Sequence, residues 1–154
     1  MKFYQHTVVF NEIPNEVTLV FEITNCPHHC EGCHSPHLWE DVGRELTKKF
    51  FIDTCEKYAT LITNVAFFGG DQHEPELLQF LELCQAIGIK ASLWTGATSV
   101  SDEIKSKLHY LKLGHYDPKF GGLDVKGTNQ VLLNVKTGEA VDMQRRRVKA
   151  QGVY

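Results

Sequence analysis

The sequence predicts an α/β fold: a single domain whose mainly parallel strands wind into an open or partly closed barrel. Segments rich in β-branched and apolar residues alternate with segments of helical periodicity, as βαβ units require. Right-handed crossovers would place consecutive strands side by side in one sheet. The length of 154 residues and a hydrophobic content of 42% suit one compact core.

Ordinary start and stop signals bound the predicted elements. Helices are expected to begin after the Thr47 cap, near Glu74 and near Ser99, and to end at about Ala59, Ile87 and Lys107. The predicted strands are Val17–Ile23, Asn64–Phe68, Ile89–Trp94, Tyr110–Leu113 and an edge strand, Gln130–Val135. Residues 114–128, rich in Gly, Asp and Lys, are expected to form a loop.

Composition narrows the class of protein. A formal net charge of −3 gives no indication of nucleic-acid binding. No apolar stretch is long enough to span a membrane, and residues 1–6 lack the pattern of a signal peptide, so a cytoplasmic location is expected. We expect residues 1–138 to form the domain and residues 139–154 a basic tail, in which Arg145–Arg147 and Lys149 are a solvated segment or a docking patch.

Three cysteines follow the first predicted strand in the spacing C-x3-C-x2-C, at Cys26, Cys30 and Cys33. Thiolates are soft ligands that suit zinc, copper(I) or iron–sulfur clusters. Three thiolates can hold three irons of a cubane and leave the fourth iron open to a substrate, as an open coordination position does in catalytic zinc sites. Gly32 allows the loop to turn tightly around such a core.

Other interpretations of the cysteines remain open at this point. The three thiols could be unligated, or they could form a zinc site completed by one of four nearby histidines: His28, His29, His34 or His37. Cys55 and Cys84 lie on apolar faces of predicted helices and are expected to be buried core residues.

Two further motifs fall where strands end. Gly69-Gly70-Asp71 follows the second predicted strand, and Trp94-Thr95-Gly96 closes the third. Chemistry in parallel α/β folds gathers at the carboxyl ends of the strands. The sequence therefore predicts that these motifs and the cysteines contribute to one site.

At these residues the chain resembles the radical S-adenosylmethionine superfamily. It is similar in particular to the family of anaerobic ribonucleoside-triphosphate reductase activating proteins, and the similarity covers nearly all of the chain to about residue 134. The matching segments keep their order in the sequence: Cys26–Trp39, Phe67–Asp71, Leu93–Gly96 and Asp117–Gln130.

The resemblance implies an incomplete (β/α) barrel with a 4Fe-4S cluster and S-adenosylmethionine as cofactors. It implies an oxidoreductase that reductively cleaves S-adenosylmethionine to a 5′-deoxyadenosyl radical and generates a glycyl radical on its partner. That partner would be the glycyl-radical subunit of anaerobic ribonucleoside-triphosphate reductase. A low-potential electron donor such as flavodoxin or ferredoxin would supply the electron.

The resemblance also assigns residues. Cys26, Cys30 and Cys33 would be the cluster ligands, and no general acid or base is expected because cluster and cofactor carry the chemistry. The expected cofactor-binding residues are Gly32, Cys33, His34, Gly69, Gly70, Asp71 and Thr95.

The chain departs from the family pattern at several positions. Asn11–Glu16 replaces a glycine-rich turn, His34 replaces an aromatic residue, and Gln72 replaces a proline. The cysteine motif alone does not separate a reductase activase from an activase of another glycyl-radical enzyme or from another radical enzyme. A non-enzymatic zinc-binding module is the alternative from a different class.

Overall fold

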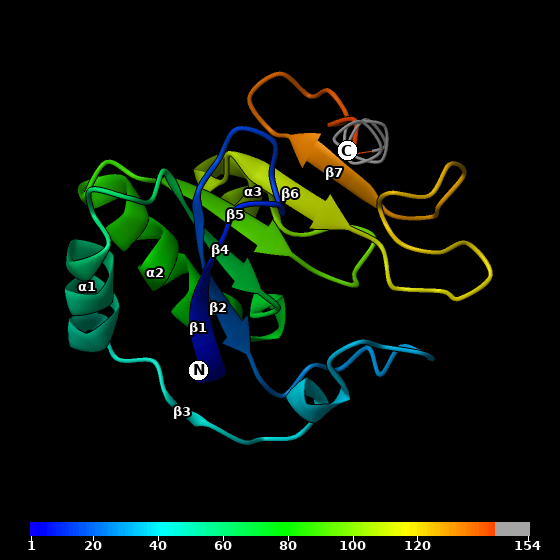
Figure 1. Cartoon of the computed structure of the whole chain (residues 1–154). Coiled ribbons are helices and arrows are strands. Elements are labelled where there is room, and N and C mark those ends of the chain that lie inside the picture. Colours follow the sequence, from blue (N-terminus) through cyan, green and yellow to red (C-terminus); the bar gives the residue numbers. More distant parts are fainter. Residues whose placement is uncertain (144–154) are drawn as a thin grey trace, which may run out of the picture.

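The computed structural model describes residues 1–143, which form a seven-stranded mixed sheet in the order β3-β1-β2-β4-β5-β6-β7 (Figure 1). The strands are β1 (Lys2–Val9), β2 (Thr18–Ile23), β3 (Arg44–Glu45), β4 (Asn64–Phe68), β5 (Lys90–Trp94), β6 (Tyr110–Leu113) and β7 (Val131–Asn134). The helices are α1 (Lys48–Lys57), α2 (Glu74–Ala86) and α3 (Asp102–Lys107), with 3-10 turns η1 (Pro36–Trp39) and η2 (Asp71–His73).

Four adjacent strands at the centre of the sheet, β2, β4, β5 and β6, run parallel in sequence order. Strands β1 and β7 flank them in antiparallel pairing, and β3 adds a short antiparallel edge to β1. Helix α1 lies between β2 and β4 in the chain, α2 between β4 and β5, and α3 between β5 and β6. The sheet is therefore parallel in its interior and mixed as a whole.

The helix boundaries follow from local chemistry. The hydroxyl of Thr47 accepts a hydrogen bond from the N–H of Phe50, and the hydroxyl of Ser101 accepts one from Ile104, so both side chains cap free N–H groups of a first turn. Pro75 lies in the first turn of α2, where its missing N–H costs nothing. The predicted strand Asn64–Phe68 coincides with β4, and Tyr110–Leu113 coincides with β6.

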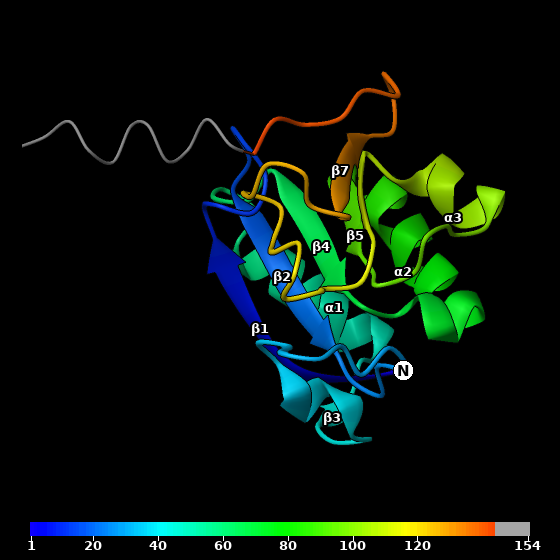
Figure 2. The ribbon, with the colours of Figure 1, turned by 90° about the vertical axis from the view of Figure 1, so that its right-hand side faces the viewer.

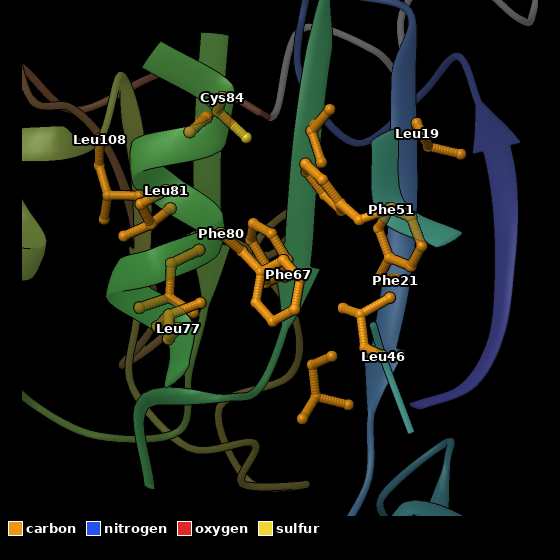
Figure 3. Close-up of a cluster of buried hydrophobic side chains, with 14 of the residues drawn as sticks. Leu19, Phe21, Leu46, Phe51, Phe67, Leu77, Phe80, Leu81, Cys84 and Leu108 are labelled. Atoms are coloured by element: carbon orange, nitrogen blue, oxygen red, sulfur yellow. The ribbon is translucent and has the colours of Figure 1, made fainter. Parts of the chain in front are cut away.

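The main core lies between the sheet and the helices, which cover one of its faces (Figures 1 and 2). Aromatic rings dominate it: Phe51 of α1 packs on Phe21 of β2 and Phe67 of β4, with ring centroids 5.4 and 6.0 Å apart. Phe80 of α2 completes the group, 5.3 Å from Phe51 (Figure 3). Cys84 also faces this core and is fully buried, as Cys55 nearly is, so the prediction that both are core residues is confirmed.

The opposite face of the sheet carries no helix among the described residues. The segment 114–130, between β6 and β7, passes over β2 and β4 there (Figure 2). Beyond β7 the chain folds back along that strand, and the N–H of Val141 donates to the carbonyl of Leu132 at 2.7 Å. Met143 packs with Ile13 and Leu132 in a second, smaller core. The basic residues predicted to form a tail, Arg145–Arg147 and Lys149, lie outside the described residues.

The strand β1 was not predicted from the sequence. It alternates poorly, because a bulge between Phe3 and His6 shifts its register against β2. No described helix is both long enough and apolar enough to cross a bilayer. All four parallel strands end at the same edge of the sheet, where the cysteine-containing loop and the loops after β4 and β5 meet.

Candidate iron–sulfur site

The cysteine loop leaves the carboxyl end of β2 and is closed at its base by backbone hydrogen bonds. The N–H of Asn25 donates to Glu40 at 3.1 Å, and the N–H of Cys26 donates to Leu38 at 2.9 Å. Within the loop, Asn25, His29 and Gly32 all have left-handed backbone angles, at φ values of 63°, 45° and 72°. Such conformations cost free energy in non-glycine residues and are typical of functional loops. Three residues with left-handed backbone angles therefore shape the loop that carries the cysteines.

Cys26, Cys30 and Cys33 are free and half-buried. The N–H of Cys33 donates to the carbonyl of Cys30 at 3.1 Å, and the Cys33 sulfur accepts the N–H of Ser35 at 3.3 Å. Burial raises the pKa of the Cys26 thiol, although hydrogen bonds from the backbone of His28 and His29 oppose this. The charges of Cys30 and Cys33 also raise the pKa of Cys26, because three thiolates are gathered in one loop.

The described residues contain no group of three His, Cys, Asp or Glu side chains arranged to hold a single metal ion. A tetrahedral zinc site needs its ligands close around one centre. A cubane binds each thiolate to a different iron, so its protein ligands stand farther apart. In the described residues, the three cysteines and the four nearby histidines therefore do not form a site for a single metal ion.

A cavity of about 170 Å³ lies where the loops after β2, β4 and β5 meet. Cys26 and Cys33 face it from the first loop, Gly69 and Asp71 from the second, and Thr95 from the third. The prediction that the three strand-end motifs share one location is confirmed by this cavity. Its wall is completed by Ile23, His28, Ser35, Leu38, Trp39, Phe68, Gln72, Trp94 and Gly96.

Gly69 and Gly70 turn the chain sharply at the end of β4. Their φ values of 84° and 112° lie in the left-handed region that favours glycine. The N–H of Gly69 donates to the carbonyl of Trp94 at 2.8 Å, which ties the loop to the end of β5. The hydroxyl of buried Thr95 donates to the carboxylate of Asp71 at 2.9 Å, so the two loops are also joined by side chains.

Gln72 is a site residue that the sequence analysis noted only as a departure from a pattern. Its Oε1 accepts the N–H of Gly70 at 2.9 Å, while its Nε2 donates to the carbonyls of Thr24 and Asn25, both at 3.1 Å. One side chain therefore fastens the turn after β4 to the first residues of the cysteine loop. A lone glutamine after a turn carries no sequence signal for this role.

His28 also lines the cavity, and its ring lies directly against Gly96. A Cβ atom at Gly96 would come within 2.7 Å of the ring, so this contact requires glycine. The Nε2 atom of His28 is buried without a hydrogen-bond partner among the described residues. A buried nitrogen in this state is free to bind a polar group that enters the cavity.

Three predicted cofactor-binding residues, Gly32, His34 and Gly70, lie outside the cavity wall. Gly32 faces Tyr116, whose ring carbon would lie 3.4 Å from a Cβ at that position. The His34 ring meets the same tyrosine edge-on, with centroids 5.4 Å apart. The segment after β6 thus closes over the third cysteine, and a contact of Gly32 or His34 with cofactor stays a prediction.

Lys112 on β6 is the second residue that the sequence analysis missed. Its side chain is 9% exposed, and its Nζ donates to the carbonyls of Gly114 at 2.5 Å and Thr95 at 3.4 Å. Burial lowers the pKa of Lys112 to about 8, and the charges of Cys30, Cys26 and Cys33 act in the opposite direction. A buried ammonium group therefore lies within electrostatic reach of all three thiols.

The comparison with known families identifies an iron–sulfur protein. The sequence matches the family described as "4Fe-4S single cluster domain" over residues 16–117, which is about two-thirds of the chain. The chain belongs to this family, and the matched region extends from the start of the parallel sheet through the cysteine loop to just beyond β6. Neither curated proteins nor solved structures gave a match.

Proposed function

We propose that this iron–sulfur protein is a radical S-adenosylmethionine oxidoreductase that activates anaerobic ribonucleoside-triphosphate reductase. In this proposal a 4Fe-4S cluster, when bound, supplies the electron that cleaves S-adenosylmethionine to a 5′-deoxyadenosyl radical, which generates a glycyl radical on the reductase. The observation that carries the proposal is the cavity shared by Cys26, Cys33, Asp71 and Thr95. A cofactor there would touch the cluster ligands and the strand-end motifs at once.

The donor set suits such a cluster. Cys26, Cys30 and Cys33 would each ligate one iron, and Cys55 and Cys84 are buried in the helical core, away from the cysteine loop. No fourth thiol on that loop competes for the last iron among the described residues. The open position is what binding of a substrate's amino and carboxylate groups requires.

The remaining residues of the cavity would bind and orient the cofactor. Asp71, held by the hydroxyl of Thr95, would accept hydrogen bonds from its polar groups, and Gly69 would allow close approach to the backbone. Trp39, Phe68 and Trp94 would exclude water from the reacting atoms. His28 Nε2, which has no partner in the described chain, offers one more polar contact.

The choice of partner is supported by the resemblance in sequence. In the proposed complex, a radical-bearing loop of the reductase would reach the cavity from outside. Four adjacent parallel strands end at the site, and we interpret them as the open part of an incomplete (β/α) barrel. The half-buried state of the three cysteines fits an accessible site. A low-potential donor such as flavodoxin or ferredoxin would deliver the electron.

The test begins with protein purified without oxygen, in which iron and sulfide are counted. About four irons per chain are expected. Reductant and S-adenosylmethionine are then added, and 5′-deoxyadenosine is measured. The Cys30→Ala variant should lose both cluster and cleavage, whereas Cys84→Ala, a matched change at a core thiol, should keep both.

Zinc in place of iron, with no cleavage after anaerobic reconstitution, would support the zinc-binding module instead. Cleavage without any glycyl radical on the purified reductase would keep the radical chemistry and remove the proposed partner. Electron paramagnetic resonance on a mixture of the two proteins separates these outcomes.

A further inference from the structure

The ammonium group of Lys112 is buried among neutral acceptors. The carbonyls of Gly114 and Thr95 accept two of its hydrogen bonds. The side-chain oxygen of Gln130, in the amide orientation that satisfies its neighbours, accepts a third hydrogen bond from Lys112 Nζ at 3.0 Å. The same oxygen accepts the N–H of Tyr116 at 3.3 Å. No carboxylate of residues 1–143 forms an ion pair with Lys112. Three donors are thus satisfied while the positive charge itself is not compensated.

A buried charge is costly unless an opposite charge lies nearby. The groups that would act favourably on Lys112 are the cysteines in their deprotonated form, which binding of a cluster requires, with Cys30 first, then Cys26 and Cys33. Lys112 stands opposite Trp94 in the pairing of β5 with β6, and its carbonyl accepts the N–H of Thr95 at 3.0 Å. The backbone therefore places Lys112 directly beside Trp94 and Thr95, two residues of the cavity wall.

We propose that Lys112 is a fixed positive charge that raises the reduction potential of the bound cluster. The step concerned is the transfer of one electron from an external donor to the oxidised cluster, with no bond broken and no proton moved. The reduced cluster carries one more negative charge than the oxidised one, so a nearby cation stabilises it more. The inference rests on the cluster and is independent of S-adenosylmethionine cleavage and of the partner.

The experiment measures the midpoint potential of the reconstituted cluster by a dye-equilibrated dithionite titration followed by absorbance, without S-adenosylmethionine. Lys112→Met removes the charge and keeps the length of the side chain. About a tenfold fall in the equilibrium constant for reduction is expected, which is about 59 mV toward more negative potential for a one-electron couple. Lys112→Arg keeps the charge and should recover most of this shift.

Lys90→Met is the matched control. It also removes one positive charge from the sheet, but at the opposite end of β5, where Lys90 pairs with Glu16. Its potential should equal that of the unchanged protein. Iron and sulfide content and the absorbance spectrum are recorded for every variant, so that only intact clusters are compared.

Lys112→Gln replaces the ammonium with a neutral donor for the same carbonyls and serves if the methionine variant does not fold. An intact four-iron cluster with an unchanged potential in either neutral variant overturns the proposal. An equal shift in Lys90→Met would also overturn it, because the effect would then be one of net charge. Absence of iron from the unchanged protein would instead contradict the assignment of a cluster, which is a failure distinct from that of the Lys112 proposal.

Discussion

The hydroxyl of Thr95 donates a 2.9 Å hydrogen bond to the carboxylate of Asp71, and this contact links the loops that follow β5 and β4. The same hydroxyl accepts the N–H of Ala97 at 3.0 Å. Thr95 is buried, whereas Asp71 is half-buried and lines the cavity. The threonine therefore fixes the direction in which the carboxylate faces an incoming ligand.

Replacement of Asp71 tests this arrangement directly. Asp71→Ala should weaken binding of S-adenosylmethionine to cluster-loaded protein by tenfold or more, since a charged acceptor is lost from the cavity. Thr95→Val should weaken it less, because the carboxylate remains but is no longer held. Equilibrium dialysis measures both. Thr98→Val, an exposed change in the same loop, is the control, and unchanged binding in Asp71→Ala would remove this side chain from the site.

The five cysteines should separate into two classes of reactivity. In cluster-free protein, Cys26, Cys30 and Cys33 are half-buried and should react readily with a thiol reagent. Burial raises the pKa of Cys55 to about 12 and raises that of Cys84 as well, so both should react only after denaturation. Three fast thiols are expected before denaturation and five after it.

Loading of the cluster should protect the three fast-reacting thiols, Cys26, Cys30 and Cys33, from the reagent. In cluster-free protein, Cys84→Ala should leave the number of fast-reacting thiols unchanged. Ellman's reagent with stopped-flow detection gives the count. A fourth fast thiol, or protection of Cys84 on loading, would contradict the assignment of three loop ligands.

Gln72→Ala should loosen the cysteine loop. The substitution removes the hydrogen bonds to Gly70, Thr24 and Asn25, each of which contributes about 1 kcal/mol. The expected result is faster loss of iron to a chelator, together with a lower melting temperature because three hydrogen bonds are lost. Gln79→Ala, on the exposed face of α2, is the control. Equal rates of iron loss in the two variants would mean that Gln72 does not restrain the loop.

Glu16 should make the fold sensitive to acid. Burial opposes its charge, but hydrogen bonds from Lys90, Thr63 and Tyr110 prevail and hold the pKa of Glu16 below its usual value of 4.5. A carboxyl whose pKa is lower in the folded state stabilises the fold above the unfolded pKa, and this contribution is lost as pH falls through the folded value. Glu16→Gln should therefore cost about 1–3 kcal/mol in the free energy of unfolding at pH 7.

The difference in the free energy of unfolding between the unchanged protein and Glu16→Gln should narrow below about pH 4.5. There the unchanged protein begins to lose the stabilising contribution that the variant lacks. Urea unfolding followed by circular dichroism at several pH values measures it. Asp53→Asn, which breaks an exposed ion pair with Lys49, should have little effect at any pH. A gap that persists undiminished at pH 3 would contradict the role given to Glu16.

Periodicity and capping signals were sufficient to predict the helices and the interior strands. Thr47, Pro75 and the apolar run of β4 act locally, so their effect can be read from neighbouring residues. Strand β1 was missed because its pairing with β2 includes a bulge and its stability comes from distant residues, as the packing of Phe3 on Phe21 illustrates.

The site was predictable where its residues form motifs and not where they act alone. The cysteines and the Gly-Gly-Asp turn are recognised by spacing, and the structure brings both to one cavity. Lys112 and Gln72 acquire their roles only when β6 and the turn after β4 come close to the cysteine loop. A single lysine or glutamine has no periodicity or spacing from which such a role could be inferred.

The aromatic core lies between the sheet and its helices, while the cysteine loop lies beyond the ends of the strands and is closed by its own backbone hydrogen bonds. We therefore expect the core of this chain to fold whether or not the cluster is bound. If air destroys the cluster, the polypeptide should remain a folded apoprotein in which a new cluster can be assembled from iron and sulfide. Damage of this kind calls for repair of an inorganic part and not for synthesis of a new protein.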